Sequence, residues 1–120
     1  MTRAHPDRAR DYLQHIIEAI DRACGYVAGM NAAAFERDMR TQDAVIRSLQ
    51  IIGEAANKAR VADPSLQSSA PDIPWDVMYG MRNRIIHDYF EVDLDVVWQT
   101  LQGDLPVLRS QIVQLLERLS

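Results

Sequence analysis

The sequence of 120 residues contains a single cysteine, Cys24, so no disulfide can form within the chain. One free thiol is typical of a reducing compartment, and we expect a cytoplasmic protein. No run of apolar residues approaches the ~18 that a membrane-spanning helix needs. Residues 1–6 also lack the apolar segment of a signal peptide. These absences predict a soluble protein with no membrane attachment.

The sequence also has fewer basic than acidic residues. Thirteen Lys and Arg residues stand against 17 Asp and Glu residues, which gives a formal net charge of -4. A protein that coats nucleic acid in general would show a basic face, so this charge balance argues against that class. A small local anion site is still compatible with the sequence, because residues 82–89 carry two positive charges, Arg82 and Arg84, against one carboxylate, Asp88.

The usual signatures of metal and cofactor sites are missing as well. His5 and His15 have no cysteine or carboxylate partners at ligand spacing, which argues against a zinc site. The chain has no Gly-rich phosphate loop, no nucleophile elbow and no pair of catalytic acids. We therefore expect neither a metal ion nor an organic cofactor.

What the sequence does contain is an apolar fraction of 48% in a chain long enough for one domain. We expect a single domain over residues 1–120, with a core that needs no disulfide. Apolar residues recur at steps of three and four in three segments, which indicates helices. These stripes are Leu13, Ile16, Ile17, Ile20, Cys24 and Val27; Val45, Leu49, Ile52, Ala56 and Ala59; and Leu94, Val97, Leu101, Leu105, Leu108, Ile112, Leu115 and Leu119.

Capping and breaking residues set the expected helix ends. The first helix should begin near Asp7 and end near Gly29, and Asn31 should cap a short helix that follows. Thr41 is the expected N-cap of the next long helix. That helix should stop near Asp63, because Pro64 follows it.

The segment 64–74 holds three prolines and three serines and is expected to be a loop. A further helix should open at Pro74–Trp75 with Asp72 as its cap, and bury Met78, Met81 and Ile85. Asp93 or Asp95 should open the last helix, which Pro106 should kink with help from Gly103. No apolar alternation long enough for a strand is visible. The sequence thus predicts an all-α bundle of four long helices plus a short one, with apolar surface left for a second subunit.

Residues 82–89, with the sequence Arg-Asn-Arg-Ile-Ile-His-Asp-Tyr, concentrate the groups that can do chemistry. On one straight helix Asn83 and His87 would share a face, and Arg82 would lie ~140° around the helix from His87. Two arrangements would let Arg82 and His87 act together. The helix bends or ends at His87, or two subunits bring their motifs together across a two-fold axis.

An Arg–His pair around a phosphate can cleave RNA without a metal ion. The ribose 2′-OH attacks the adjacent phosphorus, and His87 takes or gives a proton at neutral pH. The guanidinium of Arg82 stabilises charge on the phosphoryl oxygens, and Asn83 orients the imidazole or the phosphate. The alternative is structural: His87 as a helix-end cap, and Arg82 and Arg84 as exposed charges paired with nearby carboxylates, Asp76, Asp88 or Glu91.

The chain resembles the HepT-like toxins of the HEPN superfamily over about residues 8–117. That family carries Arg, four to six residues, then His, often extended to His-x-Tyr, and Arg82, His87 and Tyr89 match this pattern. Further matches are Gly53-Glu54-Ala55, Ile73-Pro74-Trp75, Gly80-Met81-Arg82-Asn83 and Val97-Trp98.

The resemblance implies a HEPN-like, dimeric fold and a metal-independent endoribonuclease toxin of a two-gene toxin–antitoxin system. It implies an RNA substrate and a partner antitoxin, a nucleotidyltransferase of the MNT type, that transfers AMP to Tyr89. Arg82 and His87 would be catalytic and Asn83 would orient. A rival reading is a non-catalytic binding subunit of a nucleotidyltransferase complex, because both readings need the same fold and partner.

A few other residues carry weaker expectations. Cys24 lies on an apolar stripe and is expected in the core rather than as a nucleophile. Trp75 and Trp98 are expected to pack in the core or at a subunit seam. Gly53 belongs to a small-residue surface that favours close helix packing. Glu54 is left open, either as a buried ion-pair partner of Arg82 or Arg84, or as an exposed residue.

Overall fold

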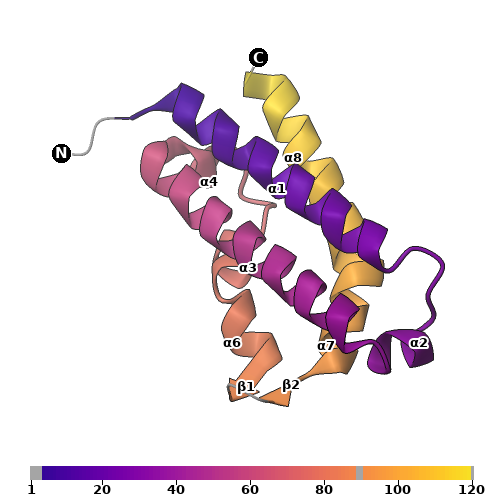
Figure 1. Cartoon of the computed structure of the whole chain (residues 1–120). Coiled ribbons are helices and arrows are strands. Elements are labelled where there is room, and N and C mark those ends of the chain that lie inside the picture. Colours follow the sequence, from indigo (N-terminus) through magenta and orange to yellow (C-terminus); the bar gives the residue numbers. More distant parts are fainter. Residues whose placement is uncertain (1–3, 89–90, 120) are drawn as a thin grey trace.

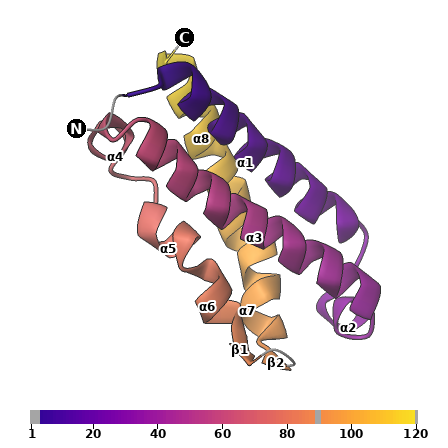
Figure 2. The ribbon, with the colours of Figure 1, turned by 60° about the vertical axis from the view of Figure 1, so that its left-hand side comes forward.

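Three long helices form the frame of the molecule. The computed structural model describes residues 4–88 and 91–119, with side chains for all of these except Arg82, Ile86, His87 and Asp88. Helices α1 (Pro6–Tyr26) and α3 (Met39–Ala62) lie antiparallel and side by side, and α8 (Leu105–Leu119) packs behind them (Figures 1 and 2). The short α2 (Ala32–Glu36) connects α1 to α3.

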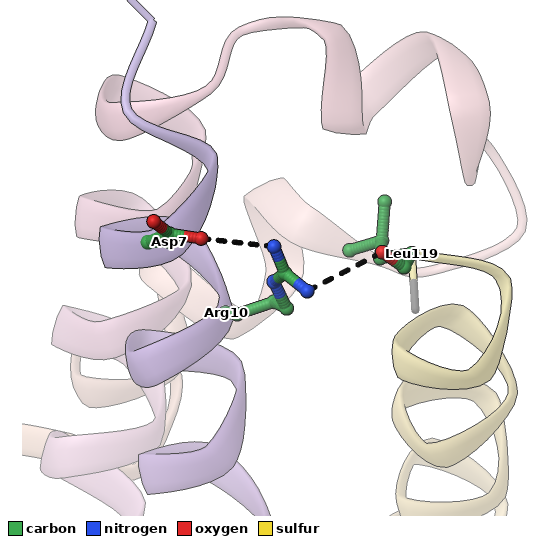
Figure 3. A network of polar contacts seen from close by, with 3 residues as sticks. All are labelled: Asp7, Arg10 and Leu119. Atoms are coloured by element: carbon green, nitrogen blue, oxygen red, sulfur yellow. Dashed lines mark hydrogen bonds and ion pairs between the residues drawn. The ribbon is translucent and has the colours of Figure 1, made fainter.

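The three predicted apolar stripes form the core that joins these helices. Every stripe residue is buried except Cys24, Leu94 and Leu119, which are partly buried against the core. The all-α fold class is therefore confirmed. At the end where α1 begins and α8 finishes, Arg10 Nη2 donates to Asp7 Oδ1 at 2.9 Å and its Nη1 donates to the carbonyl oxygen of Leu119 at 3.4 Å (Figure 3).

Caps agree with the sequence at two helix ends and differ at a third. Asn31 caps α2 by accepting from the Ala34 N–H at 2.8 Å, and α3 ends at Ala62, just before Asp63. The prediction that Thr41 caps α3 is wrong. Asp38 is the cap, because its carboxylate accepts the Thr41 N–H at 3.0 Å, and this bond lowers the pKa of Asp38.

The fourth long helical segment of the sequence-based prediction is divided in the structure. It consists of α5 (Trp75–Tyr79) and α6 (Met81–Ile85), which meet at Gly80. The predicted cap Asp72 is also wrong, since α5 has no side-chain cap and the Asp72 carbonyl instead accepts from Gln111 Nε2 of α8 at 3.1 Å. The segment expected to be a loop contains a helix of five residues, α4 (Ser65–Ser69).

A short antiparallel ribbon, which the sequence did not predict, follows α6. Strand β1 (Ile86–Asp88) pairs with β2 (Glu91–Val92), at the end of the molecule opposite to the start of α1 (Figure 1). Strands of three and two residues are too short to show an alternating apolar pattern. The ribbon leads into α7 (Leu94–Gln99), and Asp93, one of the two predicted openers, caps that helix by accepting the Val96 N–H at 3.2 Å.

Between α7 and α8 the chain forms a π-helical turn, η1 (Thr100–Asp104). The Leu105 N–H reaches back five residues to the Thr100 carbonyl oxygen. Pro106 follows and has no N–H, so it cannot continue an α-helical ladder without a gap. The irregularity expected at Pro106 is therefore present, in the form of a π turn just before it.

The contact between α3 and α5 is unusually close at Gly53. A Cβ atom at this position would lie 2.5 Å from the carbonyl oxygen of Met78, so a side chain here would collide with backbone. Two polar contacts support the same region: Arg60 Nη1 of α3 meets Asp76 Oδ1 of α5 at 2.7 Å, and Trp75 Nε1 donates to the Ala70 carbonyl oxygen at 3.1 Å. The close packing predicted from the small residues around Gly53 is confirmed.

Gly53→Ala should destabilise the fold, because the new methyl group must push α3 and α5 apart. We expect a loss of about 1–3 kcal/mol in the free energy of unfolding, measured by urea denaturation. Gly25→Ala in α1 is the matched control, since a Cβ there meets nothing within 4 Å. The control should be neutral or stabilising by up to ~1 kcal/mol. Equal effects of the two variants would contradict the close contact.

Candidate functional site

Residues 82–88 span a change from helix to strand. Arg82, Asn83 and Arg84 lie in α6, which ends at Ile85, and His87 lies in β1. The helix ends before His87, as the first of the two arrangements requires, and the second arrangement, a two-fold dimer, stays a prediction. The prediction that Asn83 and His87 share a helix face is wrong for the same reason, because only Asn83 is helical.

Buried residues and backbone hydrogen bonds hold this junction in place. Met81 and Ile85 are buried in the core, so α6 is anchored along one side. The Asp93 N–H donates to the Ile85 carbonyl oxygen at 2.7 Å, which satisfies a carbonyl group at the end of α6 and ties α7 to it. The strand pairing then joins Ile86 to Val92 and Asp88 to Glu91, with an irregularity in register between the two pairs. The backbone of the motif is thus fixed on both sides.

A cleft opens beside α6, on the side that faces α3. We call it the α3–α5 cleft; its volume is about 410 Å³. Buried residues form its floor, while its rim carries the exposed Glu54, Tyr79 and Asn83 and the partly buried Gln50. Its lining residues are Leu49, Gln50, Gly53, Glu54, Met78, Tyr79, Gly80 and Asn83.

Asn83 therefore lies at the rim of this cleft, and its orienting role stays a prediction. Glu54 lines the same cleft and is exposed, which decides the alternative that the sequence left open. Within the described part of the chain, Glu54 makes no ion pair with Arg84. The interpretation of Glu54 as a buried ion-pair partner is wrong.

Arg84 faces a different cleft from Asn83. This α6–α8 cleft has a volume of about 470 Å³ and lies between α5–α6 and the η1–α8 segment. Its polar lining includes Arg84, Asp72, Asp104 and Gln111. Successive positions on a helix point ~100° apart, so neighbouring residues of α6 serve different surfaces.

The structure describes Arg82, His87 and Tyr89 only in part or not at all. The backbones of Arg82 and His87 are placed in α6 and β1, but their side chains lie outside the described atoms. Tyr89 lies outside the described residues altogether. The catalytic roles of Arg82 and His87 and the acceptor role of Tyr89 stay predictions.

The two tryptophans and the single cysteine lie in or against the core. Trp75 is buried, and Trp98 is partly buried and packs on Phe35 with ring centroids 5.5 Å apart, so both belong to the core as predicted. Cys24 is partly buried, and its burial, followed by the nearby charge of Asp21, raises the pKa of its thiol. A raised pKa disfavours the thiolate and agrees with the prediction that Cys24 is no nucleophile.

Two residues of the α3–α5 cleft escaped the sequence analysis, namely Gln50 and Tyr79. They are far apart in the sequence, and only the contact of α3 with α5 brings them together. The available signal was Gly53, which marked a close helix approach but not which polar side chains would border it. Tyr79 is 57% exposed, so much of its ring faces solvent at the edge of this helix contact.

Residues 4–88 and 91–119 contain neither a candidate metal centre nor a candidate membrane span. Among these, no three His, Cys, Asp or Glu side chains gather in a group that could hold a metal ion. No helix in the same ranges is long and apolar enough to cross a membrane.

Comparison with known proteins adds the family. Residues 16–115 match the family model described as "Ribonuclease HepT-like". A protein of Thermococcus cleftensis named "Probable ribonuclease HepT" is 38% identical over 96% of this chain and 98% of its own length. A protein of Caldanaerobacter subterraneus subsp. tengcongensis, named as a "Putative RNase", is 31% identical over 91% of this chain and 95% of its own length.

A third relative, from Methanocaldococcus jannaschii, is named "Gamma-glutamylcyclotransferase and putative RNase". It is 34% identical over 90% of this chain, which corresponds to 47% of the relative. No solved structure matches. The family model and the relatives together cover nearly all of the sequence, and the chain belongs to the ribonuclease HepT-like family of HEPN proteins.

Proposed function

We propose that this protein is an endoribonuclease that cleaves RNA with Arg82 and His87 and needs no metal ion. The observation that carries the proposal is the setting of the motif. Arg82-x4-His87 spans a fixed helix-to-ribbon junction, and its neighbour Asn83 borders a polar cleft. The relatives named as ribonucleases support RNA as the substrate class.

In the proposed reaction the RNA supplies its own nucleophile. The 2′-oxygen forms a bond to the adjacent phosphorus as the bond from phosphorus to the 5′-oxygen breaks. A base takes the 2′-OH proton, an acid gives a proton to the leaving 5′-oxygen, and His87 performs one or both transfers. Arg82 stabilises the extra negative charge on the phosphoryl oxygens. The products are a 2′,3′-cyclic phosphate and a 5′-hydroxyl.

The active form that we propose is a two-fold homodimer with the two motifs at a shared seam. Two copies of His87 at one phosphate would provide an acid and a base at the same time. Within the cell, we propose that the protein acts as the toxin of a toxin–antitoxin pair. Its partner would be an MNT-type nucleotidyltransferase that attaches AMP to Tyr89. The added phosphodiester charge and nucleoside would repel and block an RNA phosphate.

The chemistry predicts a specific set of cleavage results. Wild-type protein should cleave RNA in the presence of EDTA, and a single 2′-deoxyribose at the cut site should prevent the cut. His87→Ala should remove cleavage by at least ~100-fold because the proton transfers are lost. Gel analysis of end-labelled RNA measures all three.

The same samples supply the controls. Circular dichroism of His87→Ala should match the wild type, and light scattering should give twice the chain mass of 13.7 kDa for both proteins. Cleavage that EDTA abolishes would contradict the proposed reaction. A wild-type chain that binds the nucleotidyltransferase but never cuts RNA would favour the rival role of a non-catalytic binding subunit.

The two arginines of the motif should differ in effect. Arg82→Lys keeps the charge but loses the planar fork that can hold two phosphoryl oxygens, so kcat should fall by ~10-fold or more. Arg84→Lys is the matched control, because Arg84 lines the α6–α8 cleft instead of the one beside Asn83. Its kcat should stay within a factor of about two. Equal losses would mean that the site responds only to overall positive charge.

Tyr89→Phe tests regulation separately from catalysis. The substitution removes only the acceptor hydroxyl, so the variant should still cut RNA but should resist the nucleotidyltransferase. Intact-mass spectrometry after co-expression should show added AMP on the wild type and none on the variant. If the antitoxin still neutralises Tyr89→Phe, the proposed modification at this residue is wrong. If the variant no longer cuts RNA, Tyr89 belongs to catalysis or RNA binding instead.

A further inference from the structure

We propose that the α3–α5 cleft binds one guanine base of the RNA, with Glu54 as the residue that selects it. This inference rests on the proposed ribonuclease function and gives it a base specificity. The cleft is the one that borders Asn83, the residue next to Arg82 in the motif. A base held there would therefore lie close to the backbone of the motif.

The cleft is large enough for a nucleobase. Its volume of about 410 Å³ lies within the range of ~300–1,000 Å³ for small-molecule pockets. Leu49, Gly53 and Met78 are buried and form an apolar floor. At Gly53 the Met78 carbonyl lies where a side chain would be, so backbone of α5 closes the floor of the cleft. The ring of Tyr79, exposed at the rim, can stack on a base.

Unused hydrogen-bonding groups surround this floor. Gln50 and Glu54 are four residues apart on α3 and line one wall, while Asn83 of α6 lines the other. Between described residues, the side chains of these three take part in no hydrogen bond or ion pair. An apolar floor with a few free polar groups around it is the usual composition of a site for a small planar ligand.

The carboxylate of Glu54 decides which base fits. It can only accept hydrogen bonds, and it can accept two in parallel. Guanine is the RNA base whose Watson–Crick edge places two donors side by side, N1–H and the N2 amino group. Adenine and cytosine offer one amino donor, and uracil offers one N–H. Gln50 or Asn83 can then donate an amide N–H to guanine O6. The cleft therefore favours guanine over the other three bases.

Lys58 offers a competing use for Glu54. It lies four residues further along α3, and both residues line a neighbouring cleft between α1 and α3. No ion pair joins Glu54 to Lys58 within the described part of the chain. If the role of Glu54 were to hold Lys58, replacing Glu54 would change Kd by the same factor for every base. If Glu54 selects guanine, the replacement would weaken binding of guanine more than that of the other bases. The experiment distinguishes these two outcomes.

The test uses labelled single-stranded DNA, because a strand without 2′-hydroxyl groups binds without being cut. Thymidine octamers carry one central guanine, adenine, cytosine or hypoxanthine, and fluorescence anisotropy gives Kd for each. Wild-type protein should bind the guanine strand ~10- to 100-fold more tightly than the others. Hypoxanthine lacks the N2 amino group, so its Kd should lie between that of guanine and those of adenine and cytosine.

Glu54→Gln should remove the guanine preference and should make guanine and hypoxanthine bind equally. Glu36→Gln is the matched control, since Glu36 is exposed on α2 and lines none of the clefts described above. Tyr79→Ala should raise Kd for every base by ~5-fold or more through lost stacking, whereas Tyr26→Ala, another exposed tyrosine, should not. Thermal melting shows that each variant is folded.

Two results would overturn the proposal: no guanine preference in the wild type, or a preference that survives Glu54→Gln. A loss of affinity in Glu54→Gln that is equal for all four strands counts as such a surviving preference. Cleavage mapping on RNA separates this outcome from a failure of the proposed function. RNA cleavage without any guanine preference would retain the ribonuclease and reject the cleft. Guanine binding without cleavage would retain the cleft and reject the ribonuclease.

Discussion

The approach of α5 to α3 at Gly53 is the contact on which the site depends. Because Gly53 has no Cβ, the Met78 carbonyl comes closer to α3 than it could if any other residue stood at position 53. This contact fixes α5, the break at Gly80 follows directly, and α6 then carries Asn83 to the edge of the cleft. A wider separation of the two helices would move the motif away from the polar side chains of α3.

Apolar burial, more than surface charge, keeps this arrangement stable. The ion pair between Arg109 of α8 and Asp21 of α1 has two short contacts, 2.7 and 3.1 Å, and lowers the pKa of Asp21. Both side chains are about half exposed, so solvent screens the pair and its contribution to stability is small. Each fully buried Leu or Ile of the stripes contributes ~1.5–3 kcal/mol before chain entropy is counted. Burial of the apolar stripes therefore holds the long helices together, and the Arg109–Asp21 ion pair adds one contact between α8 and α1.

The change from helix to ribbon gives the motif a geometry that a helix alone does not offer. On a continuous helix, Arg82 and His87 would be separated by the helical period. Here α6 ends at Ile85, a residue buried in the core, and the Asp93 N–H closes the end of the helix. The backbone of His87 then belongs to β1, which pairs with β2. Helix termination before His87, one of the two arrangements considered from the sequence, is present in the fold.

The sequence predicted most of the helices, because the features that form a helix act over a few neighbouring residues. The stripes around Leu13, Leu49 and Leu108 mark buried faces, and Asn31 and Asp93 act as caps within three residues of their partners. The irregularity before Pro106 is equally local, since it comes from a missing N–H. The N-cap predicted at Thr41 was three residues too late. Asp38 is the cap, because its carboxylate accepts the Thr41 N–H.

By itself, then, the sequence determined the all-α class, the buried faces and the motif that ties the chain to its family. Only the tertiary structure decided where the motif helix ends, that Glu54 is exposed, and that Gln50 and Tyr79 border the same cleft as Asn83. The physical reason is range. Helical periodicity and capping act over a few residues, whereas the cleft depends on a glycine of α3 meeting a backbone carbonyl of α5, 25 positions further along the chain.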